Sequence, residues 1–130
     1  MPGLRMVVVA GPRIDPAGLP THDGLEVRAF VPRLYRHLAA CDLAVVQGGL
    51  TTCMELAANR RPFLYFPLRH HFEQNLHVAH RLDRYRAGRR MDYASSDSDA
   101  IVAELGRTVD YRPVETDGTA RAASLIAELL

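Results

Sequence analysis

Two glycines and two threonines stand where an apolar run gives way to a helical pattern. The segment begins at Asp42 and reads DLAVVQGGLTTCMEL, with a turn made of Gln47, Gly48, Gly49, Leu50, Thr51 and Thr52. Glycine lets the backbone turn sharply and lets a ligand approach where a Cβ would otherwise stand. The first amides of a helix have no intrahelical partner and lie at the positive end of its dipole. The turn therefore predicts an anion site, and phosphate is the usual anion.

A carboxylate, Glu55, follows the threonines within the same helical pattern. It can accept hydrogen bonds from the two vicinal hydroxyls of a ribose while a diphosphate rests on the helix end. The alternative is structural: a tight turn with Thr51 as the N-cap and a first-turn glutamate that complements the helix dipole. The segment matches neither GxGxxG nor GxxxxGK[ST], so it supports neither a dinucleotide fold nor a triphosphatase.

A second polar cluster, PLRHHFEQN, follows the next apolar run and contains Glu73 and Gln74. The carboxyl ends of adjacent parallel strands lie at the same edge of a sheet, and ligands bind beyond that edge. A carboxylate beside an amide offers both acceptors and donors, as the hydroxyls of a sugar require. We expect Glu73 and Gln74 to face the glycine turn. The alternative is that they merely begin a helix in solvent.

The elements that must position these side chains alternate along the whole chain. Strands are predicted at 6–10, 25–30, 42–46 and 63–66, and the segment GRRMDY adds a last short one. Helices are predicted at 32–41, about 51–59, about 72–85, within SSDSDAIVAEL, and at 116–130. The run MVVVA is continuous and β-branched, as in a strand buried on both faces. The alternation predicts an α/β fold: an open parallel sheet with helices on both faces and right-handed crossovers.

Length and composition limit the class of protein. A chain of 130 residues, 48% of them hydrophobic, is expected to form a single domain over 1–130. Its net charge of +1 and its lack of an aromatic and basic stripe argue against nucleic-acid binding. No spanning helix or signal peptide is recognisable, so a cytoplasmic location is the default. Cys41 and Cys53 lack metal-type spacing and are expected to be reduced, structural thiols.

Histidines and arginines are frequent after Arg69 but form no metal motif. His77 and His80 are three positions apart without the carboxylate of an HExxH motif, so we expect no metal site. The arginines of RLDRYRAGRR, which begins at Arg81, are interpreted as solvated surface charges. Contact with anionic lipid or with a partner domain is the alternative, and nothing else in the sequence supports a membrane contact.

Taken together, these residues resemble the C-terminal, donor-binding domain of GT-B glycosyltransferases. The most similar enzymes use nucleoside-diphosphate sugars and are of the family 28 and family 1 type. The resemblance covers about 30–92, in four parts that keep the family's order: FVP, LAACDLAVVQGGLTTCMEL, RRPFLYFPLRHHFEQN and AGRRMDY. It implies a Rossmann-like open parallel sheet that forms part of a GT-B C-terminal domain.

The resemblance also implies a role for each matching residue. The backbone at Phe30 and Val31 would contact the nucleotide base, and Glu55 would hold the ribose. The residues around the diphosphate would be Gln47, Gly48, Gly49, Leu50, Thr51 and Thr52. The residues around the donor sugar would be Glu73, Gln74 and Asn75. Many family 1 members have a histidine where this chain has Gln47, so charge assistance from that position is weakened here.

By this resemblance the chain belongs to an enzyme that transfers a hexosyl group from a UDP- or dTDP-sugar to an acceptor, with no metal or further cofactor in this domain. The family's first strand, with its glycine-rich loop, and its N-terminal acceptor-binding domain have no counterpart here. No residue is assigned as catalytic, and we expect the isolated chain to be inactive. The alternatives are a non-catalytic donor-binding subunit of a split glycosyltransferase and a GT-B nucleotide-sugar epimerase.

Overall fold

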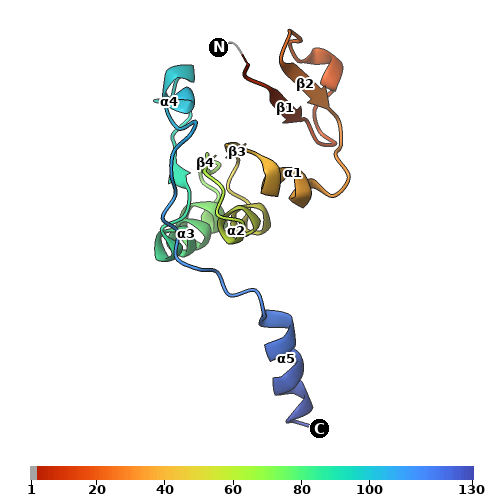
Figure 1. Cartoon of the computed structure of the whole chain (residues 1–130), viewed down its shortest axis with the longest axis vertical. Coiled ribbons are helices and arrows are strands. Elements are labelled where there is room, and N and C mark those ends of the chain that lie inside the picture. Colours follow the sequence, from red (N-terminus) through yellow and green to blue (C-terminus); the bar gives the residue numbers. More distant parts are fainter. Residues whose placement is uncertain (1–2) are drawn as a thin grey trace. The chain divides into compact units, whose positions relative to one another are not determined.

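A computed structural model describes residues 3–130, and its strands pair only in parallel. The chain divides into two compact units, residues 1–34 and 35–130, and each is described by itself. Figure 1 follows the elements along the chain, from red at the N terminus through β3, α2 and β4 to α5 in blue. Parallel strands in open sheets flanked by helices confirm the predicted fold class.

The first unit holds two strands and a short 3-10 turn. Strand β1 (Met6–Val9) pairs with β2 (Leu25–Arg28), and the 3-10 turn η1 (Pro16–Gly18) lies between them in sequence. Both strands confirm the sequence prediction, but burial of β1 on both faces is wrong, because three of its four residues are exposed. A two-stranded sheet has no central strand, and among the described residues of this unit no long helix covers it.

The sheet of the second unit has the order β3-β4-β5, formed by Ala44–Val46, Phe63–Tyr65 and Arg89–Arg90. The central strand, β4, is buried at all three positions, because it has a neighbour on each side. Helix α1 (Leu34–Ala40) precedes β3, and α2 (Leu50–Ala58) connects β3 to β4. Helix α2 contributes Cys53, Leu56 and Ala57 to the core, where they join Phe63 and Tyr65.

The segment after β4 is not one regular α-helix, as predicted, but two kinds of helix in succession. A π-helical segment, η2 (Glu73–Val78), continues directly into α3 (Ala79–Tyr85). Both bury apolar side chains, Val78 from η2 and Leu82 from α3. π-helical turns are rare in proteins, and those that occur are often found at functional sites.

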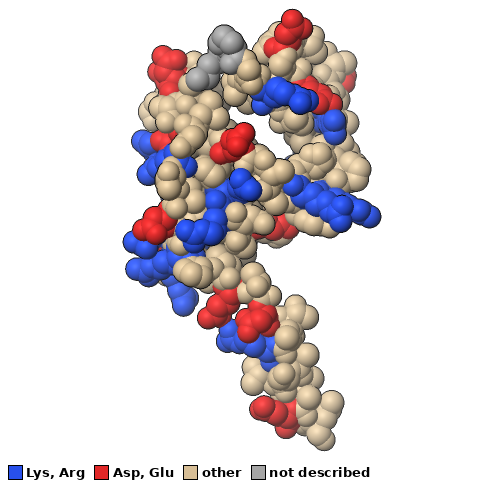
Figure 2. Space-filling view, in the orientation of Figure 1, with Lys and Arg blue, Asp and Glu red and all other residues tan. Residues whose placement is uncertain are grey.

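The last two helices contribute little to the core. Helix α4 (Ser98–Val102) begins at its N-cap Asp97, whose side chain accepts a hydrogen bond from the Ala100 amide at 2.9 Å. Helix α5 (Gly118–Ala127) has no buried residue. Both signs of charge appear on the face shown in Figure 2, in keeping with the small net charge of +1.

Candidate functional site

The two glycines after β3 have different backbone conformations. Gly48 is buried and has a φ of +116°, which L side chains rarely adopt, so the turn itself requires a glycine there. Gly49 is exposed, with ordinary extended angles of φ −65° and ψ 139°. A Cβ added at Gly49 would meet nothing within 4 Å, so neither the backbone nor the packing of the described chain requires a glycine at this position.

Helix α2 presents free amides directly behind Gly49, its N-cap. The first intrahelical bond runs from the Cys53 amide to the Gly49 carbonyl at 3.1 Å, so the amides of Leu50, Thr51 and Thr52 precede it. The N-cap makes no side-chain hydrogen bond to them. The helix therefore begins one residue earlier than predicted, and Thr51 is not its N-cap. This end of α2 can receive an anion through backbone donors.

Glu55 lies in the second turn of α2, and the interpretation of it as a first-turn glutamate is wrong. Glu55 is half-buried, and among residues 3–130 no ion pair or side-chain hydrogen bond to its carboxylate is present. It shares a face of the helix with Thr51 and Thr52, four and three residues earlier. Side chains on a helix tilt toward its N terminus, so Glu55 leans toward the free amides.

The loop after β4 lies against the glycine turn. A Cβ built on Gly48 would stand 3.6 Å from the Pro67 Cα and 3.6 Å from the Tyr65 ring. Glu73 and Leu50 line one groove of about 510 Å³, together with His77 and Arg81 of the helical segment that follows the loop. The structure thus brings the two polar clusters of the sequence to one end of the sheet, as expected for neighbouring parallel strands.

Gln74 and Asn75 are used by the protein itself. Gln74 is 7% exposed, and its Oε1 accepts a hydrogen bond from the Leu68 amide at 2.8 Å. Asn75 donates from Nδ2 to the carbonyls of Leu68 and His71, at 2.7 and 2.8 Å. Glu73, by contrast, is exposed. Of the three residues assigned to the donor sugar, Glu73 alone leaves its whole side chain available to a ligand.

Comparison with known proteins gives the chain a family. A model of the glycosyltransferase family 28 C-terminal domain matches residues 13–127. The chain belongs to this family. An uncharacterized glycosyltransferase of Methanosarcina mazei is 31% identical to it over 93 residues, which are 71% of this chain and 24% of that protein.

A solved glycosyltransferase structure agrees with this assignment. The crystal structure described as the glycotransferase of kitacinnamycin superposes with a TM-score of 0.59 and 25% identity, over 78% of this chain and 26% of its own. The chain therefore spans about a quarter of the length of these two relatives, which cover 24% and 26%. The resemblance seen in the sequence is confirmed at the level of the family and the fold.

The remaining predicted site residues of the family 28 domain are placed as follows. Gln47 is exposed at the end of β3. Phe30, 76% exposed, and Val31, 3% exposed, belong to the first unit, so their contact with a nucleotide base stays a prediction. Within residues 3–130, no group of three or more His, Cys, Asp or Glu side chains could hold a metal ion, and no helix is long and apolar enough to cross a membrane.

The thiols and one carboxylate of the domain have shifted pKa values. Cys41 and Cys53 are both free, and burial raises the pKa of Cys53 to about 11, so it is a neutral core thiol at neutral pH. Glu104, whose side chain is 7% exposed, forms ion pairs with Arg89 and Arg107. The hydrogen bond from Arg107 lowers the pKa of this carboxyl group, so it stays ionised. Sequence reasoning did not identify Glu104 or its partners.

Proposed function

We propose that this glycosyltransferase domain binds a nucleotide-sugar donor, a UDP- or dTDP-sugar, and presents its hexosyl group to an acceptor. The observation that carries the proposal is Gly49, which stands in open space with an ordinary backbone, directly before the free amides of α2. A ligand that approaches the backbone there accounts for the missing side chain, and the amides favour an anionic ligand such as a diphosphate.

Glu55 supports a nucleotide rather than a simple phosphate ion. Among the described residues its carboxylate has no cation or hydrogen-bond donor, although the residue is half-buried and its side chain leans toward the start of the helix. A carboxylate in that state is set up to accept hydrogen bonds from a neutral donor such as a ribose hydroxyl. It would repel a second anion, so we assign it to the ribose and the amides of α2 to the diphosphate.

The chemistry that this domain supplies is stabilisation of the leaving group. The diphosphate gains negative charge as the bond to the sugar breaks, and backbone amides fixed at the end of α2 stabilise that charge without rearranging. We assign the acceptor and its general base to a further domain or subunit, because this chain spans about a quarter of the length of its two relatives, 24% and 26%. We therefore expect no transfer by the isolated chain with any pair of donor and acceptor.

The test is calorimetric titration of the wild type and of Glu55→Ala with UDP and with dTDP. Hydrogen bonds to a charged group contribute about 1.5–3 kcal/mol each, so nucleotide affinity should fall roughly tenfold to a hundredfold. Glu128→Ala is the matched control, because it removes the same side chain from an exposed position that follows α5. The control should bind as the wild type does.

A denaturation curve for each variant separates binding from folding. The Glu55 side chain makes no hydrogen bond or ion pair with another described residue, so its removal should change the free energy of unfolding by less than about 1 kcal/mol. A mutant that binds both nucleotides as tightly as the wild type would disprove the ribose role. A wild type that binds neither UDP nor dTDP would contradict the proposed function.

A further inference from the structure

Side chains hold the loop between β4 and η2 by hydrogen bonds to the backbone amide and the backbone carbonyl of Leu68. The Leu68 amide donates to Gln74 Oε1 at 2.8 Å, and the Leu68 carbonyl accepts from Asn75 Nδ2 at 2.7 Å. The same Nδ2 donates to the His71 carbonyl at 2.8 Å, and the His71 amide donates back to the Leu68 carbonyl at 3.1 Å. The shape of this loop therefore depends on the orientation of the Asn75 amide.

An arginine determines that orientation. Arg90 Nη2 donates to Asn75 Oδ1 at 2.6 Å, and Arg90 Nη1 donates to the Asn75 backbone carbonyl at 3.4 Å. A guanidinium group has only donors, so the oxygen of the Asn75 amide must face Arg90 and its NH₂ group must face the loop carbonyls. The short, charge-assisted bond also polarises the amide, which strengthens the two bonds that Nδ2 donates.

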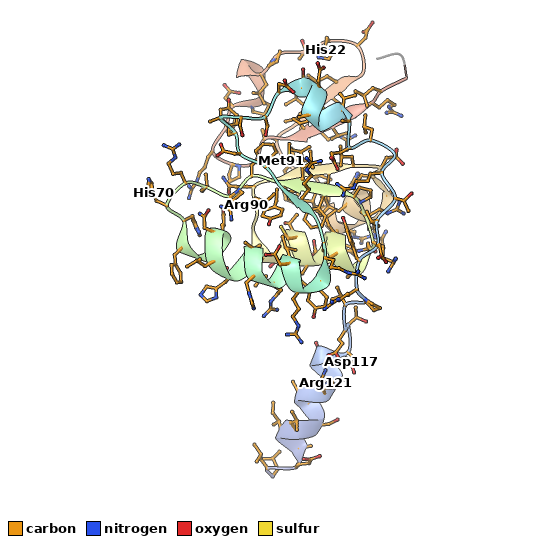
Figure 3. All side chains as sticks on the ribbon, turned by 90° about the vertical axis from the view of Figure 1, so that its left-hand side faces the viewer. His22, His70, Arg90, Met91, Asp117 and Arg121 are labelled. Atoms are coloured by element: carbon orange, nitrogen blue, oxygen red, sulfur yellow. The ribbon has the colours of Figure 1, made fainter. Side chains whose placement is uncertain are left out.

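Arg90 itself is fixed by the sheet. It is the last residue of β5 and pairs with Tyr65, the last residue of β4, so it stands at the strand end from which the loop departs. The Met91 amide continues the pairing by donating to the Tyr65 carbonyl at 2.9 Å. Figure 3 shows Arg90 beside the loop that carries His70. Because β5 fixes Arg90, its hydrogen bonds to Asn75 hold the loop in place relative to the sheet.

We propose that Arg90 is a positioning residue for the donor sugar: through Asn75 it holds the loop 67–72 and the start of η2, and hence Glu73, in the geometry that receives the sugar. The inference rests on the proposed function and concerns the sugar, not the nucleotide. By this inference, Asn75 holds the loop and does not contact the ligand directly. Arg90 also differs in role from the arginines of α3, which are solvated surface charges.

The experiment compares Arg90→Met with the wild type in titrations with UDP and with UDP-glucose, or with dTDP and dTDP-glucose if the wild type prefers thymidine. We expect the diphosphate to bind unchanged, because Arg90 does not contact the free amides of α2. The affinity gained from the sugar should fall about threefold to tenfold, which is less than for a direct charge-assisted contact because Arg90 acts on the sugar through Asn75 and the loop. Arg90→Lys should restore only part of it, since lysine cannot make both contacts.

Arg112→Met is the matched control, because Arg112 is exposed and its side chain makes no hydrogen bond or ion pair within residues 3–130. It removes the same charge and should leave both affinities unchanged. The double variant with Asn75→Ala tests the route: if Arg90 acts through Asn75, then Arg90→Met should have no further effect once Asn75 has been removed.

Amide hydrogen exchange of the segment 67–76 gives a readout that needs no ligand. Exchange at the Leu68 amide should become faster in Arg90→Met and stay unchanged in Arg112→Met. Unchanged exchange in Arg90→Met would overturn the proposal. Equal weakening of UDP and UDP-glucose would also overturn it, because Arg90 would then act directly on the diphosphate. If the wild type binds no nucleotide, the proposed function fails, and exchange still decides whether Arg90 holds the loop.

Discussion

The loops that follow β3 and β4 leave the same edge of one sheet but use their polar groups in opposite ways. After β3, the glycine turn leaves the first amides of α2 and the carboxylate of Glu55 without partners among the described residues. After β4, the side chains of Gln74, Asn75 and Arg90 bond to the loop or to one another. The first loop offers binding capacity through its backbone, whereas the second uses side chains to keep a shape.

The difference teaches that a polar cluster in a sequence has two possible uses. Glutamine and asparagine after a strand are equally suited to a ligand's hydroxyl groups and to the backbone of their own loop. Here the loop of 67–72 has backbone groups that the sheet cannot satisfy, and the nearest amide side chains bond to them. Glycine makes no such bonds, so the turn after β3 leaves its donors free.

The largest effect on folding is expected from Asn75→Ala, which removes the bonds to Leu68, His71 and Arg90. At about 0.5–1.5 kcal/mol each, the loss of three bonds should lower the free energy of unfolding by about 1.5–4.5 kcal/mol. Asn59→Ala is the matched control, because Asn59 Nδ2 makes one bond, to the Glu55 carbonyl at 2.8 Å. Urea denaturation of both variants should show the larger loss for Asn75. Equal losses would mean that the loop is not held as described.

A smaller loss is expected from Gly48→Ala. A φ of +116° is strained for alanine, and such strain costs about 1–2 kcal/mol, although an added Cβ would meet only ordinary contacts at 3.6 Å. The same denaturation experiment measures the loss. A variant as stable as the wild type would show that the turn relaxes, and that Gly48, like Gly49, is not required by the fold.

Acid should weaken the ion pairs that Glu104 forms with Arg89 of β5 and with Arg107. The pKa of Glu104 is lowered in the folded state, mainly by the hydrogen bond from Arg107, so the carboxylate stabilises the fold above its ordinary pKa of 4.5. That contribution should be lost as the pH falls below 4.5 and through the lower folded value. Stability measured from pH 7 to pH 3 should therefore fall less steeply in Glu104→Gln, which does not titrate. Parallel curves would contradict this.

The smallest change in stability, about 0.5 kcal/mol or less, is expected for Gly49→Ala, since its backbone angles suit alanine and its surroundings are open. Its affinity for UDP should nevertheless fall, on the order of tenfold, because the new methyl group stands where the diphosphate approaches. Gly118→Ala, also in open space, is the control and should leave the UDP affinity unchanged. Unchanged UDP affinity in Gly49→Ala would remove the main support for the proposed site.

The sequence predicted the order of strands and helices well, because their signals are local. A continuous β-branched run marked β1, and the apolar run before PLRHHFEQN marked β4. Glycine and threonine after an apolar run predicted the beginning of α2 to within one residue. The strand-end rule also predicted that Glu73 and the glycine turn belong to one end of the sheet.

What the sequence missed depends on contacts between distant segments. Arg90 is one of several arginines in RLDRYRAGRR, and only its pairing beside β4 brings it to Asn75, fifteen positions earlier. The burial of Glu104 between Arg89 and Arg107 likewise needs the fold. The burial of β1 was overestimated because an apolar run does not reveal how many strands or helices will cover it.

The π-helical segment η2 lets this domain lose one residue without a change in its core. A π-helix closes each turn with one more residue than an α-helix, so a deletion of one codon between Glu73 and Val78 would let the segment close as α-helix. Val78 and Leu82 would stay in the core, and the residues before the deletion would keep nearly the same orientation, because the wider π turn already holds the extra residue. Related genes that differ by such a deletion would share the core and the placement of the loop after β4, while one side chain of the segment would be absent.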